Sequence, residues 1–191
     1  MEIGTMVFLA VVVFAVLYLV MMYNGLVNLK HNVSKHLANI DVLLKQRHDE
    51  LPKLVETCRQ YMTFEQDTLE KVIKARQQVA TAQASHDMPA LGQAETGLRA
   101  NLGSLFALAE NYPDLKADSA FQSLQTRISA LENAIADRRE VYNEAVNNNN
   151  VRIEQFPDVI IARWFNFKAF DLLQFDKGEL TDVDMKSLFR S

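Results

Sequence analysis

The sequence predicts an all-α protein in which an N-terminal single transmembrane helix leads into an antiparallel, up-and-down four-helix bundle of long helices. Three observations predict this class. The segment Ile3 to Met22 is almost wholly apolar. Apolar residues then recur at three-and-four spacing through most of the chain, which is the period of a helix. The 191 residues include only six glycines and four prolines, as expected for long uninterrupted helices.

The apolar segment predicts a membrane anchor over residues 1–24. About 20 apolar residues match the roughly 30 Å hydrocarbon core of a bilayer. A cleavable signal peptide would have a positive N-terminal region, a shorter apolar run and a small-residue cleavage site, but no Lys or Arg precedes Lys30. We therefore expect a retained anchor. The alternative is a buried core helix of a soluble protein.

The orientation of the anchor follows from the basic residues near its ends. The upstream flank has none, whereas Lys30 and Lys35 follow the segment. Cytoplasmic flanks carry the excess of Lys and Arg. We therefore expect the N-terminus outside and the helical domain in the cytoplasm.

The helical-bundle domain is predicted over residues 25–157. Its first helix continues from the anchor to Leu51-Pro52, where the proline predicts a kink or a tight joint. A second helix follows over about 51–84, and Asp87 or Ser85 is the expected N-cap of the next. That third helix, about 89–111, carries three glycines, for which we expect close approach between helices.

The fourth helix has the clearest period in the chain and ends near Pro157. Its coiled-coil-like heptad stripe is formed by Phe121, Leu124, Ile128, Leu131, Ile135, Arg138 and Tyr142. Because Arg138 falls within this stripe, we expect it to be a buried or interfacial charge with a partner. The run Asn147 to Asn150 is expected to weaken the helix, since Asn competes for local backbone hydrogen bonds.

Residues 158–191 form a separate C-terminal tail that is rich in aromatic residues. They include Trp164, Phe165, Phe167, Phe170, Phe175 and Phe189. So many aromatic side chains must be covered by something. Three alternatives are open: they cap the end of the bundle, dock on a sister subunit, or lie in the membrane interface.

The composition argues against several functional classes. The net charge of −4, with both signs interspersed, argues against a nucleic-acid-binding face. Cys58 is the only cysteine, so an intramolecular disulfide and a cysteine-based zinc cluster are impossible, and we expect it in the core. The sequence has no phosphate-binding glycine loop, nucleophile elbow or HExxH motif. We therefore expect no catalytic, cofactor-binding or metal-binding residues and no enzymatic activity.

Several ordered motifs resemble those of the LemA family. They are Tyr23-Asn24, Ile40 to Arg47, Leu51 to Thr57, Tyr112 to Ala117, Phe121 to Gln125, Leu131 to Ile135, Arg138-Arg139, Tyr142-Asn143 and Phe156-Pro157. The resemblance covers nearly the whole chain. Two positions depart from it: Leu37 stands where the family commonly has Trp, and Asn149 where it commonly has Tyr.

The resemblance implies a membrane-anchored antiparallel helical bundle without established enzymatic activity. It also implies a link with membrane organisation, since magnetosome proteins of this family take part in membrane shaping. The polar motif residues lie within helix stripes and are expected to set helix register or to join subunits. With the joint and the tail, the interaction candidates are Asn24, Asp41, Lys45, Arg47, Glu56, Tyr112, Asp114, Asn133, Arg138, Arg139, Asn143, Trp164, Phe167 and Phe170.

Two functions follow as hypotheses. The first is a non-enzymatic, self-associating scaffold of the bacterial inner membrane, which acts in membrane organisation or remodelling. Its partners would be the lipid bilayer and further copies of the chain. The second is an adaptor or sensor for a membrane protease or envelope-stress system, which binds one specific protein through the joint from Tyr112 to Ala117. Neither hypothesis includes a nucleic acid or a cofactor.

Overall fold

The computed structural model describes residues 2–174 of the chain, and these residues are helical with no β-strand. The chain forms two compact units. Among these residues, the first unit consists of 2–42 and 136–172, and the second of 43–135 with 173–174. The predicted all-α class is confirmed. The predicted boundaries at residues 24 and 157 stay a prediction.

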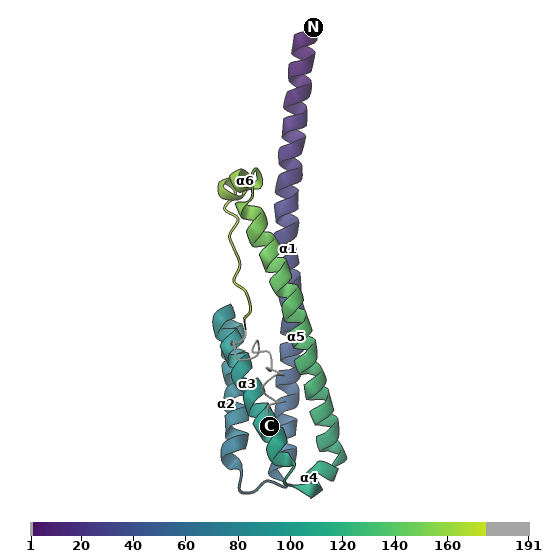
Figure 1. The fold of residues 1–191 in the computed structure, drawn as a ribbon, viewed down its shortest axis with the longest axis vertical. Coiled ribbons are helices and arrows are strands. Elements are labelled where there is room, and N and C mark those ends of the chain that lie inside the picture. Colours follow the sequence, from purple (N-terminus) through teal and green to yellow (C-terminus); the bar gives the residue numbers. More distant parts are fainter. Residues whose placement is uncertain (1, 175–191) are drawn as a thin grey trace, which may run out of the picture. The chain divides into compact units, whose positions relative to one another are not determined.

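Helix α1 spans Ile3–Arg59 and contributes to both units (Figure 1). Of the predicted kink or tight joint at Pro52, the tight joint is therefore wrong, because this proline lies inside α1. The kink stays a prediction. A proline lacks the N–H that would bond the carbonyl four residues earlier. That carbonyl belongs to His48, and it instead accepts a hydrogen bond from Nε of Arg76 at 2.9 Å. A side chain from another helix thus replaces the missing backbone donor.

The break between α1 and α2 lies after Arg59, in the segment 60–65. No glycine or proline occurs there, so the sequence offers no strong turn signal. Helix α2 then spans Gln66–Ser85 and ends at His86, which has a left-handed backbone with φ of 55°. The predicted second helix therefore begins about fifteen residues too early in the chain, as a consequence of the Pro52 prediction.

Helix α3 spans Met88–Ala109, close to the predicted range. The predicted cap is confirmed: the Asp87 carboxylate accepts a hydrogen bond from the amide of Ala90 at 2.9 Å. With only two residues between them, α2 and α3 form a helical hairpin whose helices pack against each other (Figure 1). A short helix, α4 (Pro113–Ala117), follows where the sequence predicts a joint.

Helix α5 spans Ser119–Glu154 and also contributes to both units. It continues through Asn147 to Asn150, so the asparagines do not end the helix, and the expected weakening stays a prediction. The heptad stripe holds at Phe121, Ile128, Ile135 and Tyr142, which are buried, but Arg138 is exposed. An α-helix has 3.6 rather than 3.5 residues per turn, so its buried stripe drifts and turns position 138 outward.

Helix α6 spans Asp158–Trp164 in the first unit, and residues 165–174 continue without regular structure. Phe175 and Phe189 of the predicted tail lie outside the described residues. The second unit has its own apolar core, in which Cys58 is fully buried as predicted. Other members of that core are Leu44, Leu51, Leu54, Leu69, Val72, Leu91, Leu98, Leu102, Leu105, Phe121, Leu124 and Ile128.

Candidate functional site

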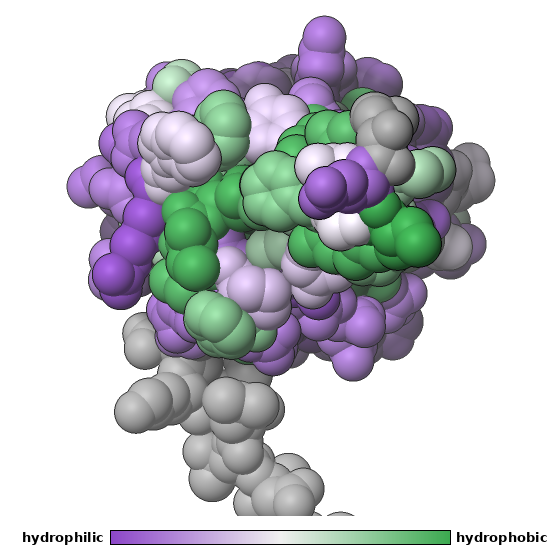
Figure 2. Space-filling view, turned by 90° about the horizontal axis from the view of Figure 1, so that it is seen from above, coloured by the Kyte–Doolittle hydropathy of each residue, from purple (hydrophilic) through white to green (hydrophobic). Residues whose placement is uncertain are grey.

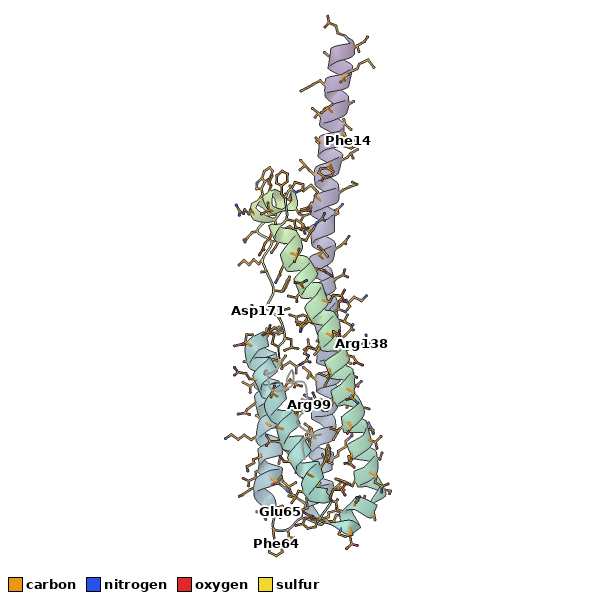
Figure 3. The ribbon with its side chains drawn as sticks, viewed as in Figure 1. Phe14, Phe64, Glu65, Arg99, Arg138 and Asp171 are labelled. Carbon is orange, nitrogen blue, oxygen red and sulfur yellow. The ribbon has the colours of Figure 1, made fainter. Side chains whose placement is uncertain are left out.

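The N-terminal part of α1 is an apolar surface without cover. Within the described residues, α1 is the one helix that is long and apolar enough to cross a membrane, and none of its apolar window is buried. Phe14, which is 73% exposed, lies on this part of the helix (Figure 3). A core helix would instead be buried against its own protein, so the alternative of a soluble core helix does not fit. From Ile3 to Met21 the surface is suited to hydrocarbon.

The exposed stretch ends where α6 packs against α1. Met22 and Leu26 of α1 are buried with Ile161 and Ala162 of α6 in one apolar cluster. Phe167, from the segment after α6, packs against the same cluster, as does Ile153 of α5. The three segments are thereby held together within the first unit.

Aromatic rings surround this junction. The Tyr23 ring lies 4.8 Å from the Phe165 ring and 5.9 Å from the Phe167 ring, measured between centroids. Trp164 contacts Phe165, with 5.8 Å between their ring centroids. Centroid separations of this size are those of favourable aromatic pairs. Of the predicted candidates, Trp164 and Phe167 are thus brought to one site, and Tyr23 and Phe165 join them.

The outward side of the junction is also apolar. Phe156, Ile160, Trp164 and Phe165 are exposed by 81%, 55%, 78% and 54%, and we call these four residues the aromatic foot. Ile160 and Trp164 stand one helical turn apart on α6. Seen from above, green apolar residues gather near the middle of the view, with purple hydrophilic residues around the rim (Figure 2). The foot is therefore packed against α1 on one side, and on the other side none of residues 2–174 covers it.

The segment after α6 is fastened to α5 by hydrogen bonds. The side-chain oxygen of Asn150 accepts from the Phe170 amide at 2.9 Å, and its nitrogen donates to the Phe170 carbonyl, also at 2.9 Å. The buried Tyr142 hydroxyl donates to the carbonyl of Asp171 at 3.0 Å. Burial, with the Asp171 carboxylate nearby, raises the pKa of Tyr142 to about 12. We call these contacts the asparagine clasp.

The clasp was not anticipated from the sequence. The run of four asparagines at the end of α5 was a signal for it, because amide side chains can pair with both groups of a neighbouring backbone. Asn149 contributes a longer hydrogen bond of 3.4 Å to the carbonyl of Lys168. Phe170, another predicted candidate, takes part through its backbone and is half-buried.

The second unit contains a buried charge cluster formed by Arg47, Glu95 and Glu132. Each carboxylate bonds one terminal nitrogen of the Arg47 guanidinium, and the Arg47 side chain is 1% exposed. Burial opposes the charge on Arg47, but Glu95 and Glu132 outweigh it and hold the pKa of the guanidinium above its usual value. The cluster connects α1, α3 and α5. Glu95 lies on the buried stripe of α3 with Leu91, Leu98 and Leu102, so its spacing was a readable signal.

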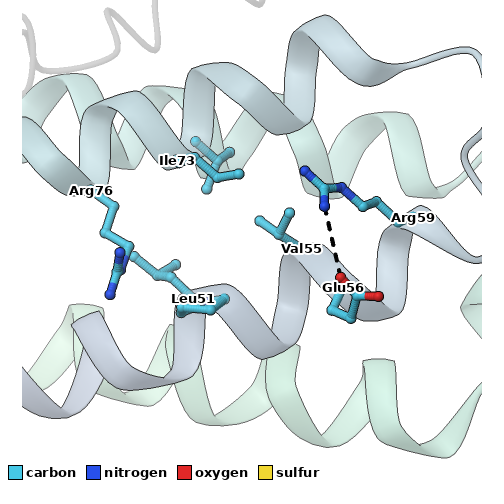
Figure 4. Close-up of a pocket in the computed structure, with 8 residues that line it drawn as sticks. Leu51, Val55, Glu56, Arg59, Ile73 and Arg76 are labelled. Atoms are coloured by element: carbon cyan, nitrogen blue, oxygen red, sulfur yellow. Dashed lines mark ion pairs between the residues drawn. The ribbon is translucent and has the colours of Figure 1, made fainter.

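A pocket in the second unit is lined by residues of α1 and α2, and Pro52 is one of them (Figure 4). Arg76 donates from Nε to the His48 carbonyl and contacts Nε2 of the same residue. Burial, and then the Arg76 cation, lower the pKa of His48. At the other end, Arg59 pairs with Glu56 at 3.9 Å. The lining is completed by Leu51, Pro52, Val55, Val72 and Ile73.

The described residues contain no group of three or more His, Cys, Asp or Glu side chains that could hold a metal ion. Burial raises the pKa of the Cys58 thiol to about 12, so at neutral pH the sulfur is a packed thiol and not a thiolate nucleophile.

The predicted polar candidates separate into buried and exposed groups. Arg47 is buried as expected, and Asp41, Arg139 and Asn143 are half-buried. The expectation that the others are embedded in helix stripes is wrong: Asn24, Lys45, Glu56, Asn133 and Arg138 are exposed. Figure 3 shows Arg138 on α5. A part for these exposed residues in contacts between copies stays a prediction.

The joint from Tyr112 to Ala117 is tied to the start of α2 in the second unit. The Tyr112 hydroxyl donates to Glu65 at 3.4 Å, and Asp114 is exposed. Nearby, Asp118 accepts hydrogen bonds from the amides of Ala120 and Phe121 at 2.7 and 3.0 Å, and from the Tyr61 hydroxyl at 2.9 Å. Asp118 therefore caps α5 and connects it to the segment after α1.

Comparisons with known proteins agree with these features. The LemA family model matches residues 36–186. Protein LemA of Metamycoplasma hominis is 25% identical over 165 residues, which cover 86% of this chain and 74% of that protein. Magnetosome protein MamQ 2 of Paramagnetospirillum magneticum is 31% identical over 101 residues, which cover 53% of this chain and 37% of that protein.

A second magnetosome protein matches over a longer part of the chain. MamQ of Magnetospirillum gryphiswaldense is 22% identical over 176 residues, which cover 80% of this chain and 65% of that protein. The chain thus spans less than two thirds of either magnetosome relative. The family match covers well over half of the chain, from the middle of α1 to beyond α6. The chain belongs to the LemA family.

Proposed function

We propose that this chain is a non-enzymatic, single-pass membrane protein that self-associates into a scaffold for membrane organisation or remodelling. The observation that carries the proposal is the exposed apolar part of α1, which no other described residue covers and which has the length of a bilayer core. The names of the magnetosome relatives support a role at a membrane. The missing catalytic motifs in the sequence favour a structural role.

The proposed scaffold subunit is an antiparallel, up-and-down four-helix bundle that follows a membrane anchor in the sequence. Three helices meet at the Arg47 cluster, and Arg76 connects the fourth, α2, to α1. The short connection between α2 and α3 favours an antiparallel arrangement of these two. The exposed polar residues of α5, Asn133 and Arg138, are the candidates for contacts between copies.

Self-association is tested by measuring particle mass for the full chain in mild detergent, by mass photometry with electron microscopy. Large, uniform particles are expected. The variant Arg138→Glu should reduce their mass, because it reverses a charge in the candidate interface. Lys74→Glu is the matched control, since Lys74 is also exposed but is not a candidate. Monomeric wild-type particles would contradict the scaffold.

We place the chain in the bacterial inner membrane, with the N-terminus outside and the helical domain in the cytoplasm. Lys30 and Lys35, which follow the apolar stretch, support this orientation. A Ser191→Cys variant with Cys58→Ala should react with a membrane-impermeant maleimide only after the inner membrane is permeabilised. Labelling of intact cells without that step would show the opposite orientation, with the helical domain outside the cytoplasm.

The second candidate function is an adaptor that binds one specific protein. It is favoured by the pocket between α1 and α2, where the exposed Ile73 adjoins Arg59 and Glu56. Photocrosslinkers placed in the joint from Tyr112 to Ala117 would then trap one dominant foreign protein. Crosslinks only between copies of the chain would favour the scaffold.

A further inference from the structure

The aromatic foot is an unusual surface because its side chains are held in place and still uncovered. Phe156 and Trp164 are 81% and 78% exposed. Single exposed apolar residues are normal, as with Phe64 of the second unit at 93%. Four of them on and beside one seven-residue helix form a patch, and such a patch marks an interaction site.

The foot lies where the uncovered part of α1 ends. Met21 is still exposed, whereas Met22 is buried against α6. If the stretch from Ile3 to Met21 crosses the hydrocarbon core, α6 lies at its boundary with the headgroups. Trp and Tyr are enriched at this depth, because their rings are apolar and their N–H and O–H groups need polar partners.

The foot cannot easily turn inward to cover itself. The Arg152 side chain pairs with the buried Asp158 at 3.0 Å, which ties the start of α6 to the end of α5. After α6, the Phe167 amide donates to the Ala162 carbonyl at 2.9 Å, and the asparagine clasp holds Phe170. Both ends of the segment are fixed, so the aromatic side chains stay directed outward.

The charged residues beside the foot also suit a lipid headgroup layer. Arg163 precedes Trp164 and Lys168 follows Phe167, and both side chains are exposed. Cations at this depth can bind lipid phosphates while their stems lie along apolar surface. The pattern of aromatic rings beside basic residues matches that of segments that lie in the membrane interface.

We propose that the aromatic foot inserts into the interfacial layer of the leaflet next to Met22, as a second membrane contact beside the spanning helix. The occupant of the patch is lipid, at the boundary between acyl chains and headgroups. This inference rests on the proposed membrane anchoring and adds to it. Two points of contact with lipid in the first unit restrict the tilt and rotation of α1. A tilt that the bilayer imposes on α1 therefore also moves α6, which packs against it.

Trp164 allows a direct test because it is the only tryptophan in the chain. Full-length protein is reconstituted into phosphatidylcholine nanodiscs, with and without brominated acyl chains, and its fluorescence is recorded. We expect blue-shifted emission, strong quenching by bromine near the glycerol end of the chain, weaker quenching by bromine near the bilayer centre, and little quenching by acrylamide in water.

The matched control moves the tryptophan to the second unit, in the variant Trp164→Phe/Phe64→Trp. Phe64 is a single exposed residue outside the foot, so its replacement should be quenched by acrylamide and not by brominated lipid. If Trp164 behaves like this control, the inference is overturned. Blue-shifted emission without lipid quenching would also overturn it, because protein and not lipid would then cover the foot.

Anchoring itself is measured separately, by alkaline extraction of the same membranes. If the protein resists extraction but Trp164 is in water, the proposed anchoring stands and only the contact between the aromatic foot and lipid is contradicted. Protein that is released at alkaline pH contradicts the anchoring, and with it the basis of this inference. A variant with Trp164→Phe, Phe165→Ser and Ile160→Ser should stay anchored while its α1 tilts more freely in oriented-bilayer spectroscopy.

Discussion

The two units of the chain depart from ordinary globular packing in opposite ways. The first leaves large apolar side chains uncovered, both along α1 from Ile3 to Met21 and on the aromatic foot. The second buries charge, with Arg47 and Glu95 at 1% and 4% exposure. Apolar surface left in water and charge removed from water are both unfavourable. Each unit must therefore have its own compensation.

The compensations come from different places. In the second unit they are internal, since the carboxylates of Glu95 and Glu132 face the Arg47 guanidinium. In the first unit they are external on our proposal, since lipid covers what the protein does not. On this proposal, the second unit compensates its buried charge within the protein, whereas the first is completed by lipid. Four changes test it, in order of expected effect.

The largest effect is expected from Arg47→Met, which leaves two carboxylates near each other without their cation. Removing one partner of a buried ion pair lowers the free energy of unfolding by about 3–5 kcal/mol. Chemical unfolding in detergent should show this loss, whereas Lys45→Met, at an exposed position on the same helix, should change the free energy of unfolding little. If the triple variant Arg47→Met/Glu95→Leu/Glu132→Leu regains most of the stability, the loss came from unpaired charge and not from lost packing.

The next effect is expected from Gly92→Ala in α3. A Cβ at this position would lie 1.9 Å from the backbone oxygen of Gln174, which cannot move as freely as a side chain. Overpacking of this kind costs about 1–3 kcal/mol. Gly97→Ala is the control: nothing lies within 4 Å of its Cβ, and replacing a helical glycine should stabilise by about 0.5–1 kcal/mol. Equal melting temperatures for the two variants would contradict the close approach of the Gln174 backbone to Gly92.

A smaller effect is expected from Asn150→Ala, which removes both hydrogen bonds of the asparagine clasp to Phe170. Because Asn150 and Phe170 are half-buried, we take about 0.5–1 kcal/mol per bond, so the loss should be about 1–2 kcal/mol and confined to the first unit. Hydrogen exchange should show the Phe170 amide losing its protection. Asn148→Ala, at an exposed position in the same run, should leave that amide protected. Faster exchange in both variants would mean that the whole helix end is loose.

The smallest effect concerns acid stability and Asp118. The Phe121 amide, followed by the Tyr61 hydroxyl, lowers the pKa of this carboxyl in the folded protein. Its stabilising contribution is therefore present above the unfolded value of about 3.9 and is lost as pH falls through the lower folded value. Asp118→Asn should flatten the fall in unfolding free energy at acid pH. Asp137→Asn, exposed on α5, should retain it.

The comparison also shows where reading the sequence succeeds. The Asp87 cap, the burial of Cys58 and the helical range after Pro89 were predicted, because each depends on neighbours a few residues away. Arg138 was misplaced because a strict heptad was extended along a straight helix. Pro52 was misread as a joint because its compensation by Arg76 comes from a different helix.

The sequence by itself determined the all-helical class, the apolar N-terminal stretch and the family, since these follow from composition, period and motif order. Only the tertiary structure decided which polar residues are buried, which aromatic residues stay exposed, and how the tail returns along α5. These features depend on pairs far apart in the chain, such as Arg47 with Glu132 or Asn150 with Phe170. Local pattern can mark one member of such a pair, as the asparagine run does for Asn150, but it does not say which distant residue is the partner.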